Sequence, residues 1–228
     1  DVSYDKFEEI DKWLISKYNK LLKEITSYYE EYDLNKVART LANFVSEDLS
    51  NWYIRRNRDR FWGSSLDNSK KSVYQTTYNV LVGLSQIIAP LTPYISEEIY
   101  QNLTGEESVH LSSFPKYDEK LIDEKLEEKM DLVRDLISIG RNAREEVKIK
   151  VRQPISEIIL DKNYKNIIGN LEDLIKEELN VKEVTYEDEL DKYMNIEYKP
   201  NYKLVGKIFG PNMKDFASYL SNISSEDR

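Results

Sequence analysis

The spacing of apolar residues most constrains how this chain can fold. From residue 5 to residue 146, apolar side chains recur at intervals of three and four, the pattern of helices that bury one face. Glycine and proline rarely interrupt it, because the 228 residues include seven glycines and six prolines, against average usage of about 7% and 5%. The sequence therefore predicts a mainly helical protein that is long enough to bury a core.

The apolar stripes predict five helices in the first two thirds of the chain. We expect these helices to start at the following positions: Asp5, Asp33, the end of the turn Gly63–Asp67, Thr92 and a point near Leu121. Thr92 suits an N-cap, and the Pro93 that follows suits the first helical position. Five helices with short connections predict a helical bundle over residues 1–146.

The pattern changes after about Val147. Three short runs read as strands, namely Ile155–Leu160, Val181–Tyr186 and Met194–Tyr198, and a helical stripe separates the first two. Strands that alternate with a helix predict a small α/β domain over residues 147–228, which is either complete or truncated. The chain begins without an initiator methionine, so we expect an excised piece of a larger protein.

The composition excludes several kinds of site. With no cysteine and one histidine, the chain can form neither a disulfide framework nor a structural zinc site. It has no run of 18 apolar residues and no signal-peptide pattern, so we expect a soluble, cytoplasmic protein without a membrane partner. We find no recurrent catalytic set and no phosphate-binding loop, so no catalytic or metal-binding residue is predicted.

One basic and aromatic segment stands out in this acidic chain, whose formal net charge is −9. Residues 51–62, Asn-Trp-Tyr-Ile-Arg-Arg-Asn-Arg-Asp-Arg-Phe-Trp, contain four arginines, four aromatics and one acid, a local net charge of +3. Arginine binds phosphate oxygens through two parallel hydrogen bonds and stacks on bases, and aromatic rings stack on unpaired bases. The segment therefore favours RNA binding, with Arg56, Arg58, Arg60 and Trp62 as the candidate contacts.

A helical wheel at about 100° per residue divides this segment. Trp52 continues the apolar stripe, and Asp48, Arg55 and Arg56 fall on the same side. Asp48 and Arg55 lie two helical turns apart, which predicts a partly buried structural ion pair. Trp62 is expected to be exposed. The alternative for the arginines is that they stabilise the bundle internally instead of contacting RNA.

A second basic segment, Arg141–Arg152, contains five bases and two acids. If residues 148–152 are extended, Lys148, Lys150 and Arg152 share one side of the backbone and can follow an RNA backbone. We take Lys148, Arg152 and the adjacent Gln153 as further candidate RNA contacts. A solvated charged surface without a ligand is the alternative for this segment.

Four stretches resemble the C-terminal anticodon-binding region of isoleucyl-tRNA synthetases, a family of class I aminoacyl-tRNA synthetases. They are residues 48–62, Ile88–Tyr100 (Ile-Ala-Pro-Leu-Thr-Pro-Tyr-Ile-Ser-Glu-Glu-Ile-Tyr), Ser108–Leu111 (Ser-Val-His-Leu) and Val151–Pro154 (Val-Arg-Gln-Pro). The second stretch is shared with the valyl, leucyl and methionyl relatives. The first is similar to the isoleucyl branch specifically, and the Arg-Gln-Pro turn agrees with it.

The resemblance implies a tRNA-binding part of a large enzyme. Such an enzyme uses ATP and magnesium to attach isoleucine to its tRNA and carries a separate editing domain. The two nucleotide-binding signatures of the family are absent from this chain, so it is expected to be inactive alone and to hold no cofactor. The implied partners are isoleucine tRNA and the catalytic and editing domains of the same chain, and we expect a monomer.

Two other hypotheses remain open at this stage. The chain could be an acidic helical-bundle module that binds a basic protein, with its arginines as structural ion pairs. It could also be a hydrolase with a carboxylate pair, which requires a deep cleft with perturbed acids.

Overall fold

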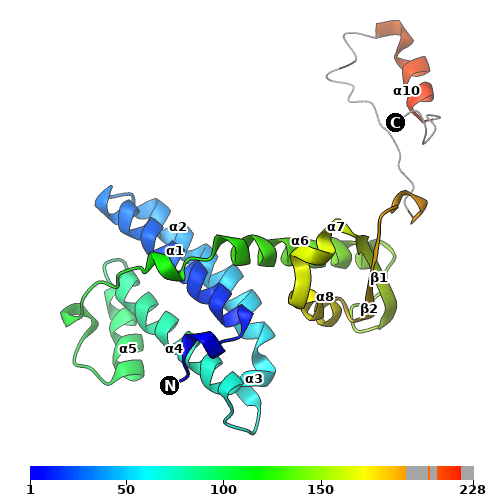
Figure 1. Cartoon of the computed structure of the whole chain (residues 1–228). Helices are drawn as coiled ribbons and strands as arrows, with labels where there is room; N and C mark the ends of the chain where they lie inside the picture. Colours follow the sequence, from blue (N-terminus) through cyan, green and yellow to red (C-terminus); the bar gives the residue numbers. More distant parts are fainter. Residues whose placement is uncertain (194–204, 206–209, 222–228) are drawn as a thin grey trace. The chain divides into compact units, whose positions relative to one another are not determined.

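In the computed structural model, residues 1–193, 205 and 210–221 are described. The chain forms two compact units, Asp1–Gly140 and Arg141–Arg228, whose elements are coloured along the chain in Figure 1. The first unit is helical, and the second contains a two-stranded sheet with helices. The predicted fold class, mainly α with a small α/β part, is confirmed. The domain boundary expected between residues 146 and 147 stays a prediction.

Long helices joined by short turns make up the first unit. Its elements are the turn η1 (Tyr4–Lys6), α1 (Glu9–Glu30), α2 (Leu34–Asn43), the π-helix η2 (Phe44–Ile54), α3 (Arg58–Trp62), α4 (Asn68–Ile88), α5 (Pro93–Thr104), the turns η3 (Val109–Leu111) and η4 (Glu119–Leu121), and α6 (Glu124–Glu146), whose last turns belong to the second unit. Helix α1 packs against α2 and α4, and α4 packs against α5 (Figure 1).

Local capping chemistry sets the helix ends. The Asp33 side chain accepts from the backbone N–H of Lys36 and begins α2, and the Asp67 side chain does the same for Lys70 and begins α4. Pro93 is the first residue of α5, as its fixed φ allows. Gly105 ends α5 at a φ of 73°, a left-handed conformation that glycine adopts without steric cost.

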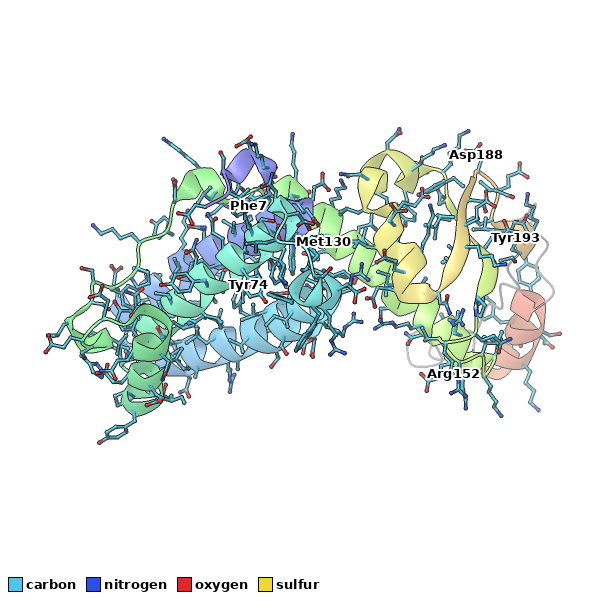
Figure 2. All side chains as sticks on the ribbon, turned by 90° about the horizontal axis from the view of Figure 1, so that it is seen from below. Phe7, Tyr74, Met130, Arg152, Asp188 and Tyr193 are labelled. Atoms are coloured by element: carbon cyan, nitrogen blue, oxygen red, sulfur yellow. The ribbon has the colours of Figure 1, made fainter. Side chains whose placement is uncertain are left out.

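The core of the first unit contains apolar side chains from α1, α2, η2, α4 and the first half of α6. Its largest fully buried members include Trp13, Leu14, Leu22, Ile25, Val37, Tyr53, Ile87, Met130 and Ile137; Met130 is labelled in Figure 2. Helix α6 is held to α1 by polar contacts as well, since Ser16 donates to Glu127 over 2.5 Å and Lys129 pairs with Glu9 over 3.1 Å. The core therefore joins segments more than one hundred residues apart.

Helices α1 and α4 approach closely at Gly83. A methyl group on Gly83 would overlap the Tyr18 hydroxyl of α1 and would lie 2.7 Å from Tyr18 Cζ. Gly83 is buried, so the Tyr18 ring fills the space that a side chain would need. Glycine is thus required here by packing, although it is a weak helix former.

Replacing Gly83 with alanine should lower the melting temperature of the first unit. Alanine normally stabilises a helix interior by about 1 kcal/mol relative to glycine, but overpacking of a core costs about 1–3 kcal/mol. Thermal unfolding followed by circular dichroism measures the net effect of the gain in helix propensity and the cost of overpacking. Adding Tyr18→Phe should recover part of the loss, since it removes the overlapping hydroxyl. A higher melting temperature for the single variant would contradict the close packing.

The second unit is built on two parallel strands. Strands β1 (Ile155–Asp161) and β2 (Val181–Glu187) pair in parallel, with Ile155 opposite Val181 and Asp161 opposite Glu187. The other elements are α7 (Asn163–Ile168), η5 (Gly169–Leu171), α8 (Glu172–Leu179), η6 (Asp191–Tyr193), η7 (Gly210–Asn212) and α10 (Met213–Ser221). Two of the predicted strands and the helical crossover between them are confirmed. The predicted strand Met194–Tyr198 lies outside the described residues.

Candidate nucleic-acid interface

The basic segment of residues 51–62 follows a change in helix geometry. Phe44–Ile54 is π-helical, so each hydrogen bond spans five residues instead of four. The wheel was drawn for an α-helix and misplaces residues across this stretch. Asp48 is buried at 6% exposure, as expected, whereas Arg55 is exposed and its Nε donates to the Asn51 carbonyl over 2.8 Å.

Asp48 has two cationic partners from other helices. Arg134 Nη1 of α6 donates to Asp48 Oδ1 over 2.7 Å, and Lys17 Nζ of α1 lies 3.9 Å from Oδ2. The Arg134 guanidinium also lies 5.7 Å from the Trp13 ring and 5.5 Å from the Trp52 ring. Sequence reasoning missed Arg134, because the pairing spans 86 residues. The pair of Asp48 with Arg55 stays a prediction.

Arg60 departs from its expected role. Its Nη1 and Nη2 atoms donate to the two carboxylate oxygens of Asp11 over 2.8 and 2.7 Å. Asp11 is fully buried, and the Arg60 side chain is 15% exposed. Further hydrogen bonds run from Arg60 to Asn57, Ser69 and Ser72. These bonds occupy all three guanidinium nitrogens, so we assign Arg60 a structural role, and its RNA contact stays a prediction.

The same carboxylate organises the surrounding core. Tyr53 donates its hydroxyl to Asp11 Oδ1 over 2.6 Å, and Ser72 donates to Oδ2 over 3.0 Å. Burial, reinforced by the neighbouring Asp11 carboxylate, raises the pKa of the Tyr53 phenol. Asp11 therefore links α1 to the π-helix, α3 and α4 through one buried polar network.

Arg58 and Trp62 lie on the outer side of α3. Arg58 is exposed, and Trp62 is 82% exposed, whereas Trp52 is 6% exposed. The predicted division between a buried Trp52 and an exposed Trp62 is confirmed. Arg56 is half-buried, and its RNA contact stays a prediction.

A surface hollow of about 340 Å³ opens beside Arg58 and Trp62. It is lined by Ile54, Arg58, Phe61, Trp62, Tyr74 and Thr77. Phe61 and Tyr74 meet edge to face at 5.3 Å, and the Tyr74 hydroxyl donates to the Phe61 carbonyl over 3.2 Å. Tyr74 of α4 was missed by the sequence analysis, which treated α4 only as a core helix. The available signal was that Tyr74 lies among polar residues on the solvent-facing side of α4.

Two of the five cations in the second basic segment, Arg141 and Arg144, make structural contacts. Arg141 pairs with Glu178, which is 5% exposed. Arg144 is 4% exposed, and its Nη2 donates to the carbonyls of Lys150 over 2.6 Å, Val151 over 3.3 Å and Gln153. Lys148, Lys150, Arg152 and Gln153 are exposed, and Arg152 is labelled in Figure 2.

Turns at residues 147–148 and 151–152 interrupt the segment that was expected to be extended. The N–H of Lys148 donates to Glu145, and that of Gln153 donates to Lys150, while Lys148 adopts a φ of 58°. The predicted alternation of Lys148, Lys150 and Arg152 along an extended backbone is therefore wrong. Arg144 donates to three carbonyls of this loop and so holds the backbone that carries the exposed cations.

The described part of the chain offers little to a metal ion or a membrane. No group of three or more histidine, aspartate or glutamate side chains is arranged to hold a metal among the described residues. In the same residues, every helix is too short or too polar to span a membrane.

The first unit is a helical bundle that exposes Arg55 just after the π-helix and Arg58 on α3, a basic surface typical of nucleic-acid-binding domains. Residues 11–159 match the family described as the anticodon-binding domain of tRNA ligase. Since the match covers more than half of the chain, the chain belongs to this family.

Relatives within the family agree on the type of tRNA ligase. The chain is 44% identical over 221 residues to an isoleucine–tRNA ligase of Clostridium acetobutylicum, covering 94% of this chain and 21% of the relative. It is 43% identical to the isoleucine–tRNA ligase of Clostridium novyi, covering 88% of this chain and 20% of the relative. It is 37% identical to the isoleucine–tRNA ligase of Bacteroides fragilis, covering 99% of this chain and 21% of the relative. The chain thus spans about a fifth of the length of these relatives.

Proposed function

We propose that this chain binds the anticodon stem and loop of isoleucine tRNA as part of a longer isoleucine–tRNA ligase. The observation that carries the proposal is the match of residues 11–159 to anticodon-binding domains, together with the isoleucine–tRNA ligase relatives. The longer enzyme would attach isoleucine with ATP and magnesium in its catalytic domain, and would carry an editing domain in the same chain. We infer a cytoplasmic monomer.

The positions of the exposed cations suggest which residues bind phosphates and which contact the anticodon loop. Lys148 and Arg152, with Gln153 beside them, would bind phosphates and fix the position of the RNA. Arg58 and Trp62 would contact bases or the backbone of the loop, and the half-buried Arg56 would contribute a further contact. Because the net charge of the chain is −9, these local cations must supply the attraction for RNA.

A salt titration tests the proposal. An isoleucine-type anticodon stem-loop and the same stem with a scrambled loop are titrated into the chain at several salt concentrations, with binding followed by fluorescence anisotropy of labelled RNA. We expect tighter binding of the isoleucine-type loop and an affinity that falls with salt. The variant Lys148→Ala/Arg152→Ala should bind both RNAs more weakly and reduce the salt slope by about two, one for each lost phosphate contact.

Lys125→Ala is the matched control, since Lys125 is also exposed but lies in the first turn of α6. It should leave affinity and slope unchanged. Equal affinity for the two loops would refute anticodon recognition, and a salt slope near zero would refute phosphate binding.

A further inference from the structure

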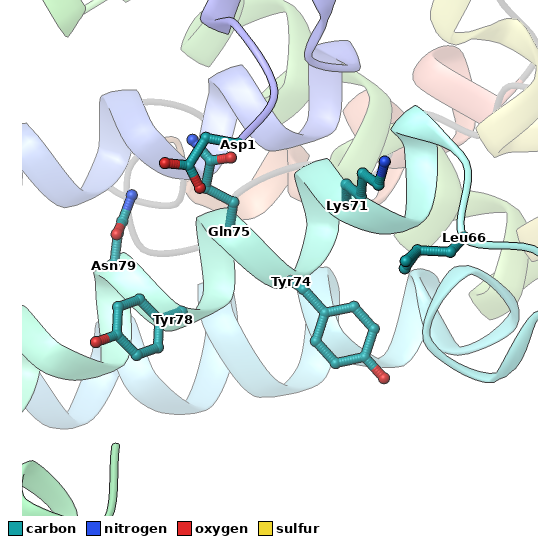
Figure 3. Close-up of a pocket in the computed structure, with 7 residues that line it drawn as sticks. All are labelled: Asp1, Leu66, Lys71, Tyr74, Gln75, Tyr78 and Asn79. Atoms are coloured by element: carbon teal, nitrogen blue, oxygen red, sulfur yellow. The ribbon is translucent and has the colours of Figure 1, made fainter. Parts of the chain in front are cut away.

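The outer face of α4 carries aromatic and polar side chains that are exposed to solvent. Tyr74 and Tyr78 lie one helical turn apart and are 50% and 44% exposed. Figure 3 shows both rings projecting from the same side of α4. Together with Trp62 of α3 they form three exposed rings, which we call the aromatic row.

Tyr74 stands between two surface hollows. The smaller is the one beside Arg58 and Trp62. The larger, of about 670 Å³, is lined by Asp1, Leu66, Lys71, Tyr74, Gln75, Tyr78 and Asn79 (Figure 3). Tyr74 lines both, so a planar group placed in each hollow would lie beside the same ring.

The Tyr74 ring is held in place on several sides. Its edge-to-face contact with Phe61 and its hydrogen bond to the Phe61 carbonyl fix the ring from α3. Lys70 lies with Nζ 5.8 Å from the ring centroid and donates to the Gly63 carbonyl over 2.6 Å. A ring that is already fixed loses little conformational entropy when a ligand stacks on it.

The charges around the aromatic row favour an anionic ligand. Arg58 lines the smaller hollow and Lys71 the larger one, and both are exposed. Among the described residues that line the two hollows, Asp1 is the only one with an acidic side chain. Exposed rings that alternate with cations are the arrangement that binds single-stranded nucleic acid, because every base has a face that stacks and every nucleotide has a phosphate.

We propose that the aromatic row binds consecutive unpaired bases of RNA, with one base in each hollow on either side of Tyr74. Trp62 lines the smaller hollow and Tyr78 the larger, so each can stack on the base in its hollow, while Arg58 and Lys71 bind the phosphates between the bases. This inference rests on the proposed function. It adds Tyr74, Tyr78 and Lys71 on α4 to the RNA-binding surface.

The tryptophans allow a direct test. Of the three tryptophans, Trp13 is fully buried, Trp52 is 6% exposed and Trp62 is 82% exposed. Tryptophan emission is recorded while the unsubstituted chain is titrated with the isoleucine-type stem-loop, and anisotropy of labelled RNA reports binding independently. We expect saturable quenching that follows the anisotropy curve and disappears in Trp62→Phe. Replacing the unpaired loop nucleotides with abasic ones should abolish the quenching.

Ring removal provides the second measurement. Tyr74→Leu and Tyr78→Leu should each weaken binding about 5- to 100-fold, the range for loss of one stacked base. Tyr74→Phe keeps the ring and should bind nearly as the unsubstituted chain does. Tyr94→Leu is the matched control, because Tyr94 on α5 is 92% exposed but lines neither hollow; its affinity should not change.

The outcomes separate this inference from the proposed function. RNA binding by anisotropy without any change in Trp62 emission, or with full affinity in both leucine variants, overturns the aromatic row and leaves the proposed function standing. No RNA binding by the unsubstituted chain overturns both. If a leucine variant fails to fold by circular dichroism, Lys71→Ala decides, because Lys71 is exposed and lines the larger hollow; full affinity of that variant overturns the aromatic row.

Discussion

Replacing Arg60 with alanine should lower the free energy of unfolding of the first unit by about 3–5 kcal/mol, the usual cost of removing one partner from a buried ion pair. The change leaves the fully buried Asp11 carboxylate without its bidentate partner. Urea unfolding at neutral pH measures the loss as a lower midpoint at an unchanged slope. Arg60→Lys should recover only part of the lost free energy of unfolding, because an ammonium group cannot reproduce the two parallel hydrogen bonds.

Arg58→Ala is the matched control. Arg58 lies two residues away on the same helix but is exposed, so its removal should change stability by less than about 0.5 kcal/mol. The double variant Arg60→Ala/Asp11→Ala should lose less than the sum of the two single losses, because the two side chains share one interaction. Equal, small effects of Arg58→Ala and Arg60→Ala would contradict the structural assignment of Arg60.

Replacing Arg144 with alanine should destabilise the second unit by about 2–3 kcal/mol, the scale of hydrogen bonds made by a charged donor. Arg144 holds the carbonyls of Lys150, Val151 and Gln153, and the Gln153 end of this loop leads within two residues to β1. Proteins of this size are stable by only about 5–15 kcal/mol, so the loss is large. Amide hydrogen exchange of β1 and β2 should become faster.

The affinity for RNA distinguishes Arg144 from its neighbour Arg152. Under the proposed function Arg144→Ala should weaken RNA binding through the disordered geometry of the loop as well as accelerate exchange. Arg152→Ala should weaken RNA binding and leave exchange unchanged, since Arg152 is exposed. Unchanged exchange in Arg144→Ala would show that the three carbonyl contacts do not stabilise the loop.

The positions of the main helices could be predicted because the signals are local. Asp33 and Asp67 accept backbone hydrogen bonds at the starts of α2 and α4, and Pro93 begins α5. Each requires only residues within one turn. The burial of Trp52 and the exposure of Trp62 were also predicted correctly, because the nine residues between them run from the apolar stripe of the bundle to its polar end.

The partners of the charged side chains could not be predicted in the same way. Arg60 binds Asp11, which lies 49 residues earlier, and Asp48 binds Arg134, which lies 86 residues later. The sequence contains 42 acidic and 33 basic residues, so many pairings agree with it. The π-helix adds a second source of error, since its hydrogen-bond pattern rotates every later residue relative to an α-helical wheel.

The helical segments, the change to an α/β pattern and the two short segments rich in positive charge could all be predicted from the sequence. These properties follow from periodicity and composition, which are carried by neighbouring residues. Which of those cations face water depends on how the helices pack. Arg60 and Arg144 are enclosed, Arg58 and Arg152 are exposed, and Tyr74 joins Trp62 at one hollow. The physical reason is that burial and ion pairing depend on contacts between distant segments, which form only when the helices pack.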